Sequence, residues 1–320
     1  MNTKKILFIA PKYFGYYQLI KNEFKELGYH TDFVPDANDN LMYIISKRNH
    51  YLLSIYKKIY CKIVNSYIKN NHYDYIVVIG GKLLSNNEWE KILSSANASN
   101  KILYQWDSMK NFDYSSFIPL FDRILTFDRR DSETDNRIEY LPLFYSSNIY
   151  KDNNNIRDID LLFIGIWHSD RLQILEKISE IALQNNKRIF FKLYYPFIPW
   201  LWIRLKKGKI MNSKFLTFKK IPLKRVNALY LRSKCILDIT NPDQSGITMR
   251  TIECIGANKK LLTTNCQIRK ESFYTEKNIY IFDRNKPKIN FQFIEESVEY
   301  PYRAKYHISE WVKHILYHER

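Results

Sequence analysis

The segment from Asp238 to Glu253, DITNPDQSGITMRTIE, has the residue types of an anion-binding turn. It leaves an apolar run, makes a polar turn and enters a run with helical spacing. Backbone N–H groups from Gly246 onward, the Thr248 hydroxyl and the Arg250 guanidinium could together hold a diphosphate at the start of that helix. The segment therefore predicts a site for the phosphates of an activated donor.

Glu253, the last residue of this segment, has a different predicted role. It lies about one turn into the helix, where its carboxylate could accept hydrogen bonds from a ribose. A purely structural alternative stays open, in which Ser245 caps the helix and Glu253 lies at the surface.

A second candidate is the turn from Ile164 to Arg171, IGIWHSDR, which follows another apolar run. Gly165 permits a close approach of the backbone to a ligand. His168 and Arg171 could bind donor phosphates, and His168 could also act catalytically on the leaving group. In the alternative, the Ser-Asp pair after His168 caps a helix and Arg171 is exposed.

In the first half of the chain, Asp107 is the preferred general base. It follows the apolar run 101–105, and Trp106 would partly desolvate its carboxylate. A base at this position would take the proton of an acceptor hydroxyl. Asp128 and Asp131 follow another apolar run, but the two arginines between them favour local ion pairing.

The elements that must position these residues alternate between short strand-like and helical runs, which is typical of a parallel sheet covered on both faces. In the first half, the predicted strands are 5–10, 31–34, 75–79, 101–105 and 123–127, and the predicted helices are 18–27, a basic helix around 52–67, and 87–95. In the second half, the predicted strands are 160–165, 189–193, 216–218, 235–239, 260–264 and 279–282, with helices at 170–184 and 304–317.

The Asn-rich segment from Ser146 to Arg157 is interpreted as a linker between two domains. We predict an α/β fold with two doubly wound Rossmann-like domains, an acceptor-binding domain at 1–148 and a donor-binding domain at 156–300. Residues 301–320 would form a helix that packs back on the N-terminal domain. Ligands of such sheets bind at the carboxyl ends of the strands, so both domains are expected to face an interdomain cleft.

The net charge of +17 is concentrated in two stretches without any acidic residue. The stretch between Asp39 and Asp74 carries Lys47, Arg48, Lys57, Lys58, Lys62 and Lys69. The stretch between Glu180 and Asp238 carries Lys187, Arg188, Lys192, Arg204, Lys206, Lys207, Lys209, Lys214, Lys219, Lys220, Lys224, Arg225, Arg232 and Lys234. Such stretches indicate an anionic partner: a nucleic acid, an anionic membrane or a phosphorylated substrate.

The aromatic run 194–203, YYPFIPWLWI, favours the membrane. Its rings, including Trp200 and Trp202, lie directly before the basic residues Arg204, Lys206 and Lys207, a combination that suits a lipid headgroup layer. We find no helix-turn-helix, RNP-like or finger motif, so we predict no nucleic-acid partner.

The earlier basic stretch leaves two interpretations open. Apolar residues recur at helical spacing from Leu52 to Tyr67, with Lys57 and Lys58 mostly off that stripe. The helix could contact a membrane, or it could be a solvated basic helix packed on a core.

Composition and motifs exclude several other classes. Hydrophobic residues make up 45% and aromatic residues 16% of the 320 residues, which excludes extensive disorder. The four cysteines lack ligand spacing, so neither zinc nor any other metal is expected. The chain has no P-loop, G-x-G-x-x-G, G-x-S-x-G or H-E-x-x-H motif. No run of apolar residues is long enough to span a bilayer, and the five-residue N-terminal run suits a strand better than a signal peptide.

The segment from Ser245 to Glu253, with CIGANKKLLTT after it, resembles the donor-site helix and following strand of GT-B glycosyltransferases. Those enzymes often carry E-x7-E followed by a small residue, glycine, a polar pair and an apolar strand. By this resemblance Glu253 matches the second Glu, which holds the nucleotide ribose. Ser245 replaces the first Glu, which contacts the donor sugar, so the sugar and the stereochemistry stay open.

The chain also looks like bacterial capsule and lipopolysaccharide biosynthesis proteins, in the runs 104–108, 121–129, 160–171 and 244–264. The resemblance implies a metal- and cofactor-independent glycosyltransferase that uses a nucleotide-sugar donor and a lipid-linked saccharide acceptor. It would be a cytoplasmic protein bound peripherally to the inner membrane. The alternatives are another phosphate-linked transfer, such as glycerol-phosphate or pyruvyl transfer, and a non-catalytic membrane-associated scaffold.

Overall fold

The computed structural model describes residues 4–36, 41–47, 49–146, 156–207, 213–242 and 245–317. Its contacts divide the chain into two compact units. The first comprises Met1–Leu143, Gln244–Gly246 and Ile308–Arg320, and the second comprises Phe144–Asp243 and Ile247–His307. Most of the predicted linker, 147–155, lies outside the described residues, so the predicted domain limits stay a prediction.

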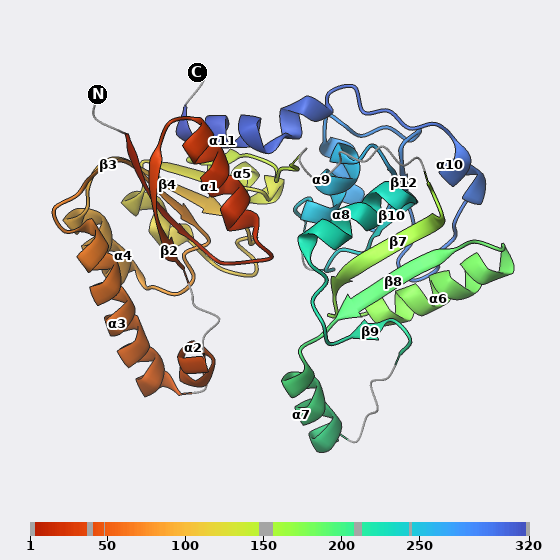
Figure 1. Ribbon diagram of the computed structural model, residues 1–320, viewed down its shortest axis with the longest axis horizontal. Helices are drawn as coiled ribbons and strands as arrows, with labels where there is room; N and C mark the ends of the chain where they lie inside the picture. Colours follow the sequence, from red (N-terminus) through yellow and green to blue (C-terminus); the bar gives the residue numbers. More distant parts are fainter. Residues whose placement is uncertain are drawn as a thin grey trace. The chain divides into compact units, whose positions relative to one another are not determined.

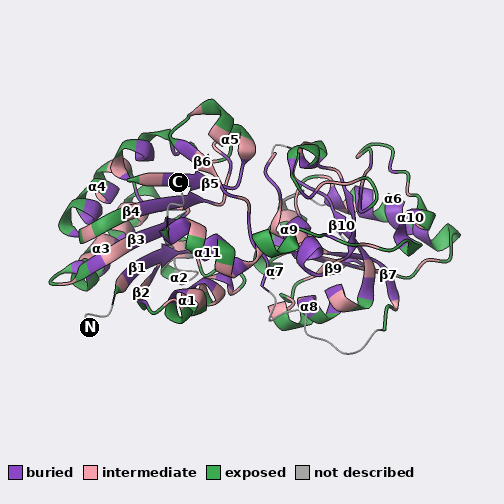
Figure 2. Cartoon of the chain, turned by 90° about the horizontal axis from the view of Figure 1, so that it is seen from above, coloured by how far each residue is buried: buried purple, intermediate pink, exposed green. Residues whose placement is uncertain are grey.

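The first unit is built on a sheet of six parallel strands in the order β2-β1-β3-β4-β5-β6 (Figure 1). The strands are β1 (Lys5–Ala10), β2 (His30–Pro35), β3 (His72–Ile79), β4 (Asn97–Gln105), β5 (Arg123–Thr126) and β6 (Ile138–Tyr140). The central strands are nearly continuous apolar runs because both faces of a parallel sheet are covered. Figure 2 shows these strands in the buried colour.

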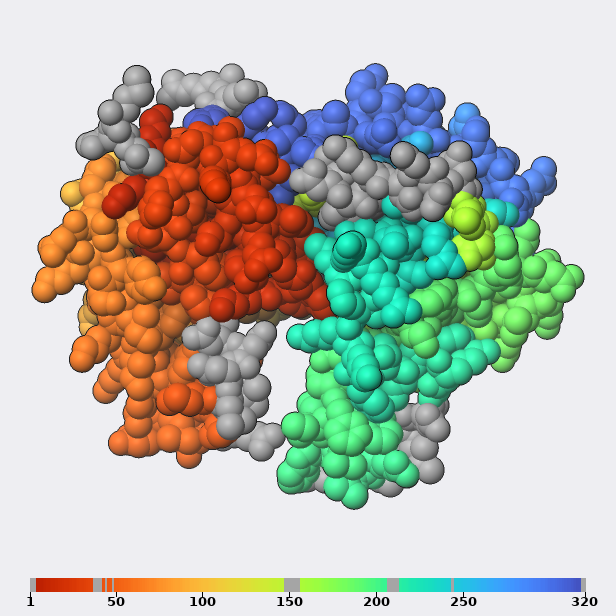
Figure 3. Space-filling view, viewed as in Figure 1, coloured from red at the N-terminus to blue at the C-terminus, as the bar shows by residue number. Residues whose placement is uncertain are grey.

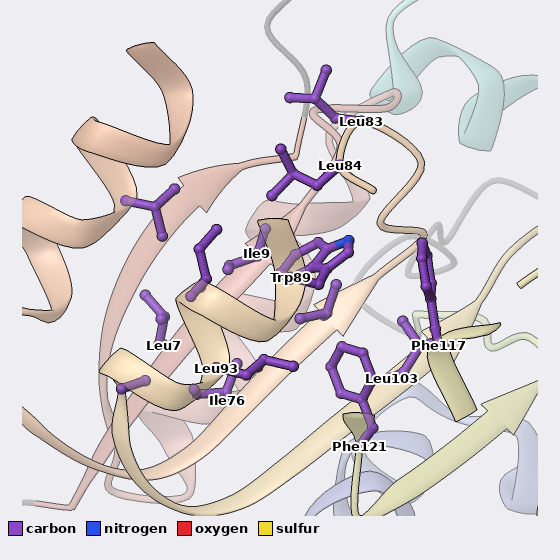
Figure 4. Packing of buried hydrophobic residues seen from close by; sticks show 14 of the residues in the cluster. Leu7, Ile9, Ile76, Leu83, Leu84, Trp89, Leu93, Leu103, Phe117 and Phe121 are labelled. Carbon is purple, nitrogen blue, oxygen red and sulfur yellow. The ribbon is translucent and has the colours of Figure 1, made fainter. Parts of the chain in front are cut away.

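The helices of the first unit are α1 (Tyr16–Glu26), α2 (Leu41–Ser46), α3 (His50–Ile68), α4 (Asn86–Ser95), α5 (Arg129–Thr134) and α11 (Ile308–Leu316), with the 3-10 turn η1 (Ser115–Leu120). Successive residues of β1 serve opposite faces of the sheet: Leu7 packs in the cluster with α3 and α4, whereas Phe8 meets Phe24 of α1 edge to face. Figure 4 shows Trp89 of α4 at the centre of that cluster, where its Nε1 donates to the Gly81 carbonyl oxygen. This core fixes the turns that follow the strands.

The second unit repeats the plan with a parallel sheet in the order β12-β11-β10-β7-β8-β9. Its strands are β7 (Ile159–Ile166), β8 (Ile189–Tyr194), β9 (Leu216–Thr217), β10 (Ser233–Asp238), β11 (Lys260–Thr263) and β12 (Ile279–Ile281). Its helical elements are α6 (Arg171–Gln184), α7 (Phe197–Lys207), α8 (Leu223–Arg232), α9 (Met249–Gly256), α10 (Phe291–Glu295) and the 3-10 turns η3 (Cys266–Lys270) and η4 (Arg303–Tyr306). Phe163 of β7 packs with Ile174 and Ile178 of α6 in this unit's core.

The structure confirms the predicted α/β class with two doubly wound parallel sheets. The prediction of one helix over 304–317 is wrong, because η4 ends at Tyr306 and the extended His307 separates it from α11. Trp311 of α11 packs edge to face on Tyr104, within the first unit. The elements α2, α5, β6, α7, α8 and α10 were not predicted. Among the described residues, no helix has the length and hydropathy required to cross a bilayer.

Candidate functional site

The carboxyl ends of β7, β10 and β11 lie side by side in the second unit, because these strands are neighbours in the parallel sheet. Asp238, the last residue of β10, is fully buried there. Its carboxylate accepts four hydrogen bonds, from Thr248 Oγ1 at 3.1 Å, Arg250 Nη1 at 2.6 Å, and Thr251 and Thr263 Oγ1 at 3.2 Å each. One carboxylate thus ties the end of β10 to the start of α9 and to β11.

Arg250, in the first turn of α9, is held from a second side. Its Nε and Nη2 donate to the Ile164 carbonyl oxygen at 3.1 and 2.9 Å, and its guanidinium lies 4.6 Å from the Phe163 ring centroid. A Cβ on Gly165 would lie 2.6 Å from Arg250 Nη2. Gly165 is therefore required for the close approach of this guanidinium to the backbone of β7.

Two more arginines lie at the same edge. Arg284, which follows β12, donates to both carboxylate oxygens of Asp170 at 2.7 and 2.9 Å and to the Thr240 carbonyl oxygen at 2.6 Å. Arg171, at the start of α6, is buried and donates to the carbonyl oxygens of Ile239 at 2.7 Å and Ile166 at 2.9 Å. Both guanidinium groups are held in place by the ends of the strands.

His168 lies near these arginines, and we define Arg171, Arg250 and Arg284 as the arginine group. Burial and then the charges of the three arginines lower the pKa of His168 to about 4, against a smaller opposite effect of Asp170. The imidazole is therefore neutral at pH 7. A positive potential at the carboxyl edge of a parallel sheet favours binding of an anion.

The structure thus brings together Gly165, His168, Arg171, Thr248 and Arg250, five of the residues that the sequence proposed for the donor. Thr248 caps α9, since its Oγ1 accepts from the Thr251 N–H at 3.2 Å.

Several details of the structural alternatives differ from the structure, and the functional roles of these residues stay predictions. Thr248, and not Ser245, is the cap of α9. Glu253 and Arg171 are each 6% exposed, so neither faces solvent as the alternatives require. Asp170 precedes α6, but it makes no side-chain cap bond and pairs with Arg284 instead.

Ser245 and Gly246 differ from the other proposed donor ligands, because their contacts group them with the first unit. Ser245 Oγ donates to both carboxylate oxygens of Asp128 at 2.7 and 2.8 Å, and the Gly246 N–H donates to the same carboxylate at 3.1 Å. A Cβ on Gly246 would lie 2.3 Å from the Phe127 ring. The Gly246 N–H is thus already directed at a carboxylate, which is not the predicted arrangement.

Asp107 lies in the first unit, directly after the carboxyl end of β4, as predicted. Its carboxylate forms an ion pair with Lys82 at 2.5 Å, and both side chains are slightly more than 40% exposed. The ion pair fixes the position of the carboxylate, and the role of Asp107 as a base stays a prediction.

The aromatic, basic segment of the sequence forms α7. Trp200 is largely buried, stacks on Phe197 and carries Arg204 over its ring at 5.4 Å. The outward side chains include Phe197 at 50%, Ile198 at 64%, Trp202 at 51% and Leu205 at 73% exposure. Figure 3 shows α7 as a projection of the second unit. The side chains of Lys206 and Lys207 lie outside the described residues.

Sequence reasoning missed three residues at this edge: Asp238, which accepts four hydrogen bonds, Arg284 of the arginine group, and Asp170, which pairs with Arg284. Asp238 ends the apolar strand β10 and Arg284 closely follows β12, which is the available sequence signal. That signal alone does not predict which of the polar residues at the ends of different strands contact one another. Such contacts depend on which strands are neighbours in the sheet.

No protein family model and no curated protein sequence matches the chain. Solved structures are similar over nearly its whole length. Sucrose-phosphate synthase from Thermosynechococcus elongatus has a TM-score of 0.58 at 11% identity, covering 98% of this chain and 95% of that one. UDP-GlcNAc 2-epimerase from Methanocaldococcus jannaschii and MurG from Acinetobacter baumannii each have a TM-score of 0.53, at 10% and 7% identity, covering 98% of both chains. These likenesses show the fold, a pair of Rossmann-like units of the GT-B type.

Proposed function

We propose that the protein is a glycosyltransferase that moves a sugar from a nucleotide-activated donor to a surface-polysaccharide acceptor. The acceptor would be a lipid-linked saccharide of capsule, O-antigen or lipopolysaccharide synthesis, reached at the cytoplasmic surface of the inner membrane. Such a reaction needs an anion site for the donor diphosphate, a base for the acceptor hydroxyl and a means of contacting the membrane.

The observation that carries this proposal is the arginine group beside His168. Three guanidinium groups lie at one carboxyl edge, and after burial their charges are the main cause that lowers the pKa of His168. A donor diphosphate would meet these charges together with the N-terminus of α9. When the bond between the sugar and the phosphate breaks, the electron pair goes to the phosphate oxygen. Preorganised positive charge stabilises that developing anion.

The remaining roles follow from the chemistry of the side chains. His168, neutral at pH 7, would donate one N–H to a phosphate oxygen and become more basic as the diphosphate arrives. Glu253 is the proposed ligand of the ribose, and Asp107 is the proposed base that takes the acceptor proton. Neither a metal nor a cofactor is required by these steps.

One surface of the second unit supports an acceptor at a membrane. The outward face of α7 presents Ile198, Trp202 and Leu205, each more than half exposed, and Arg204 of the same helix lies over the Trp200 ring. Aromatic and aliphatic side chains next to a cation suit the headgroup layer of an anionic bilayer.

The proposal is tested with UDP-GlcNAc and with a panel of GDP-, dTDP- and CMP-sugars. A true donor at a hundredfold excess over its Kd should stabilise the protein by about 2.7 kcal/mol. Products are then analysed by mass spectrometry. Transfer to a lipid-linked saccharide supports the proposal. An epimerised nucleotide sugar as product would instead assign the chain to the chemistry named for the epimerase neighbours. The absence of nucleotide binding would favour the scaffold alternative.

A matched pair of variants locates the site. Arg284→Gln removes one charge of the arginine group and should weaken donor binding about tenfold or more. Arg232→Gln is the control, because Arg232 pairs with Asp158 at the opposite, amino edge of the same sheet. Equal donor affinity in the two variants would contradict a site at the carboxyl edge.

A second measurement follows the His168 imidazole by NMR, with His168→Gln for assignment. Its pKa should start near 4 and rise when UDP binds, because the diphosphate offsets the arginine charges. UDP should therefore bind with proton uptake and more tightly as the pH falls toward 5. A pKa of His168 that UDP leaves unchanged would exclude a diphosphate at this edge.

A further inference from the structure

Helix α3 of the first unit has two apolar faces, of which only one is covered. Tyr56, Tyr60, Val64 and Ile68 are buried in the unit's core. The flank next to this buried row carries a second apolar row that stays exposed: Leu52 at 40%, Ile55 at 39%, Ile59 at 44%, Ile63 at 48% and Tyr67 at 47%. A helix packed on a core needs only the first face, so the core does not explain the second.

The exposed row is continuous along the helix. Its members are spaced by three or four residues from 52 to 67, which places them in one line about 22 Å long. The neighbouring helix α2 extends the apolar surface with Met42 at 63% and Ile45 at 48% exposure. Figure 3 shows α3, in orange, at the surface of the first unit. We call Met42, Ile45, Leu52, Ile55, Ile59, Ile63 and Tyr67 the α2–α3 stripe.

The charges beside this stripe are all positive. Lys58, Lys62 and Lys69 are exposed, and no acidic residue occurs between Asp39 and Asp74. Lys57 differs from them, since it is half-buried and lies 3.8 Å from the Glu88 carboxylate. Lysines along one flank of an apolar stripe are the pattern of a helix that lies in the plane of an anionic bilayer surface.

We propose that the α2–α3 stripe is a membrane-docking surface, which places its aliphatic side chains in the interfacial layer of an anionic bilayer while Lys58, Lys62 and Lys69 bind lipid phosphates. This inference rests on the proposed function, because the proposed lipid-linked acceptor is what brings the protein to a bilayer. The surface itself is defined by the first unit alone and does not depend on the donor site.

Charge and apolar area together select the bilayer over other partners. A nucleic acid would use the lysines but would leave the aliphatic row in water. A second copy of the chain would bring two basic surfaces without acidic residues into contact, and like charges repel. A bilayer containing anionic lipid satisfies both the apolar and the charged parts of the surface.

The test is co-sedimentation of the full chain with vesicles of phosphatidylcholine, with and without phosphatidylglycerol. Wild type should bind the anionic vesicles at least tenfold more tightly, and salt should weaken the binding. Ile59→Ser with Ile63→Ser should weaken it about tenfold, since both side chains are nearly half exposed and their loss leaves the core intact. Lys58→Gln with Lys62→Gln should weaken it about 25-fold, at about fivefold for each lysine.

The matched control is Leu183→Ser, because Leu183 is 57% exposed on α6 of the second unit and is not part of the stripe. It should bind vesicles like wild type. Circular dichroism should be unchanged in every variant, which excludes a loss of folding as the cause of weaker vesicle binding. The response to UDP should also be unchanged, which excludes an effect on the donor site. Equal binding to both vesicle types, no binding, or full binding by the isoleucine variant would overturn the proposal. So would a dimer that the isoleucine variant abolishes.

Discussion

The ion pair between Arg250 and Asp238 should hold the carboxyl edge of the second unit's sheet together, and its removal should lower the stability of the protein. Asp238 is fully buried and the Arg250 side chain is 12% exposed, with 2.6 Å between Nη1 and Oδ1. Arg250→Met would leave the carboxylate with three hydroxyl donors, from Thr248, Thr251 and Thr263. The sequence alone presents Arg250 as a ligand only, whereas the structure gives it a structural role as well.

The expected magnitude follows from this geometry. Breaking a buried ion pair by removal of one partner costs about 3 to 5 kcal/mol, because the remaining charge is left without compensation. The three remaining hydroxyl donors reduce this loss, so we expect the destabilisation by Arg250→Met to lie near the lower end of that range. Replacing both partners, as in Arg250→Met with Asp238→Asn, leaves no buried charge and should cost at least about 2 kcal/mol less than the sum of the single losses.

The assay is urea denaturation at pH 7, followed by circular dichroism, for wild type, the two single variants and the double variant. Arg232→Gln is again the control, since its partner Asp158 lies at the exposed amino edge. Single losses below about 1 kcal/mol, or losses that add without coupling, would refute the structural role that we derive for this pair.

Three further predictions concern other parts of the fold. Burial raises the pKa of Asp36 to about 7, so the folded state holds its proton more tightly than the unfolded state does. This group's contribution to stability should therefore be full below pH 4 and fall by about 4 kcal/mol as the pH rises to 7. Denaturation of Asp36→Asn should show a flatter pH profile, and parallel profiles would contradict this. Trp311→Ala should cost about 3 to 5 kcal/mol in urea denaturation, because Trp311 is 2% exposed against Tyr104, and a loss under 1 kcal/mol would contradict that packing. Gly165→Ala should displace the Arg250 guanidinium and weaken UDP binding about tenfold by calorimetry, with wild-type affinity as the contrary result.

Local patterns were enough to predict most of the sheet. The apolar runs that became β1, β3, β7 and β10 are buried on both faces, so their side chains show strand character without any knowledge of their neighbours. The turn before α9 could likewise be predicted as polar and helix-initiating, because N-terminal capping depends on a few adjacent residues. The capping residue itself was not predicted, since Ser245 and Thr248 both have suitable side chains.

Local sequence was therefore enough to predict the fold class and to find five of the residues that lie at the carboxyl edge of the second sheet, where we propose the donor site. Which of these residues contact one another depends on the tertiary structure. Strand order places the ends of β7, β10 and β11 together, so Asp238, Arg250 and Arg284 from distant parts of the chain share one edge. The packing of the first unit also leaves the α2–α3 stripe exposed. Burial and contact between distant residues depend on how the elements pack, which no local pattern specifies.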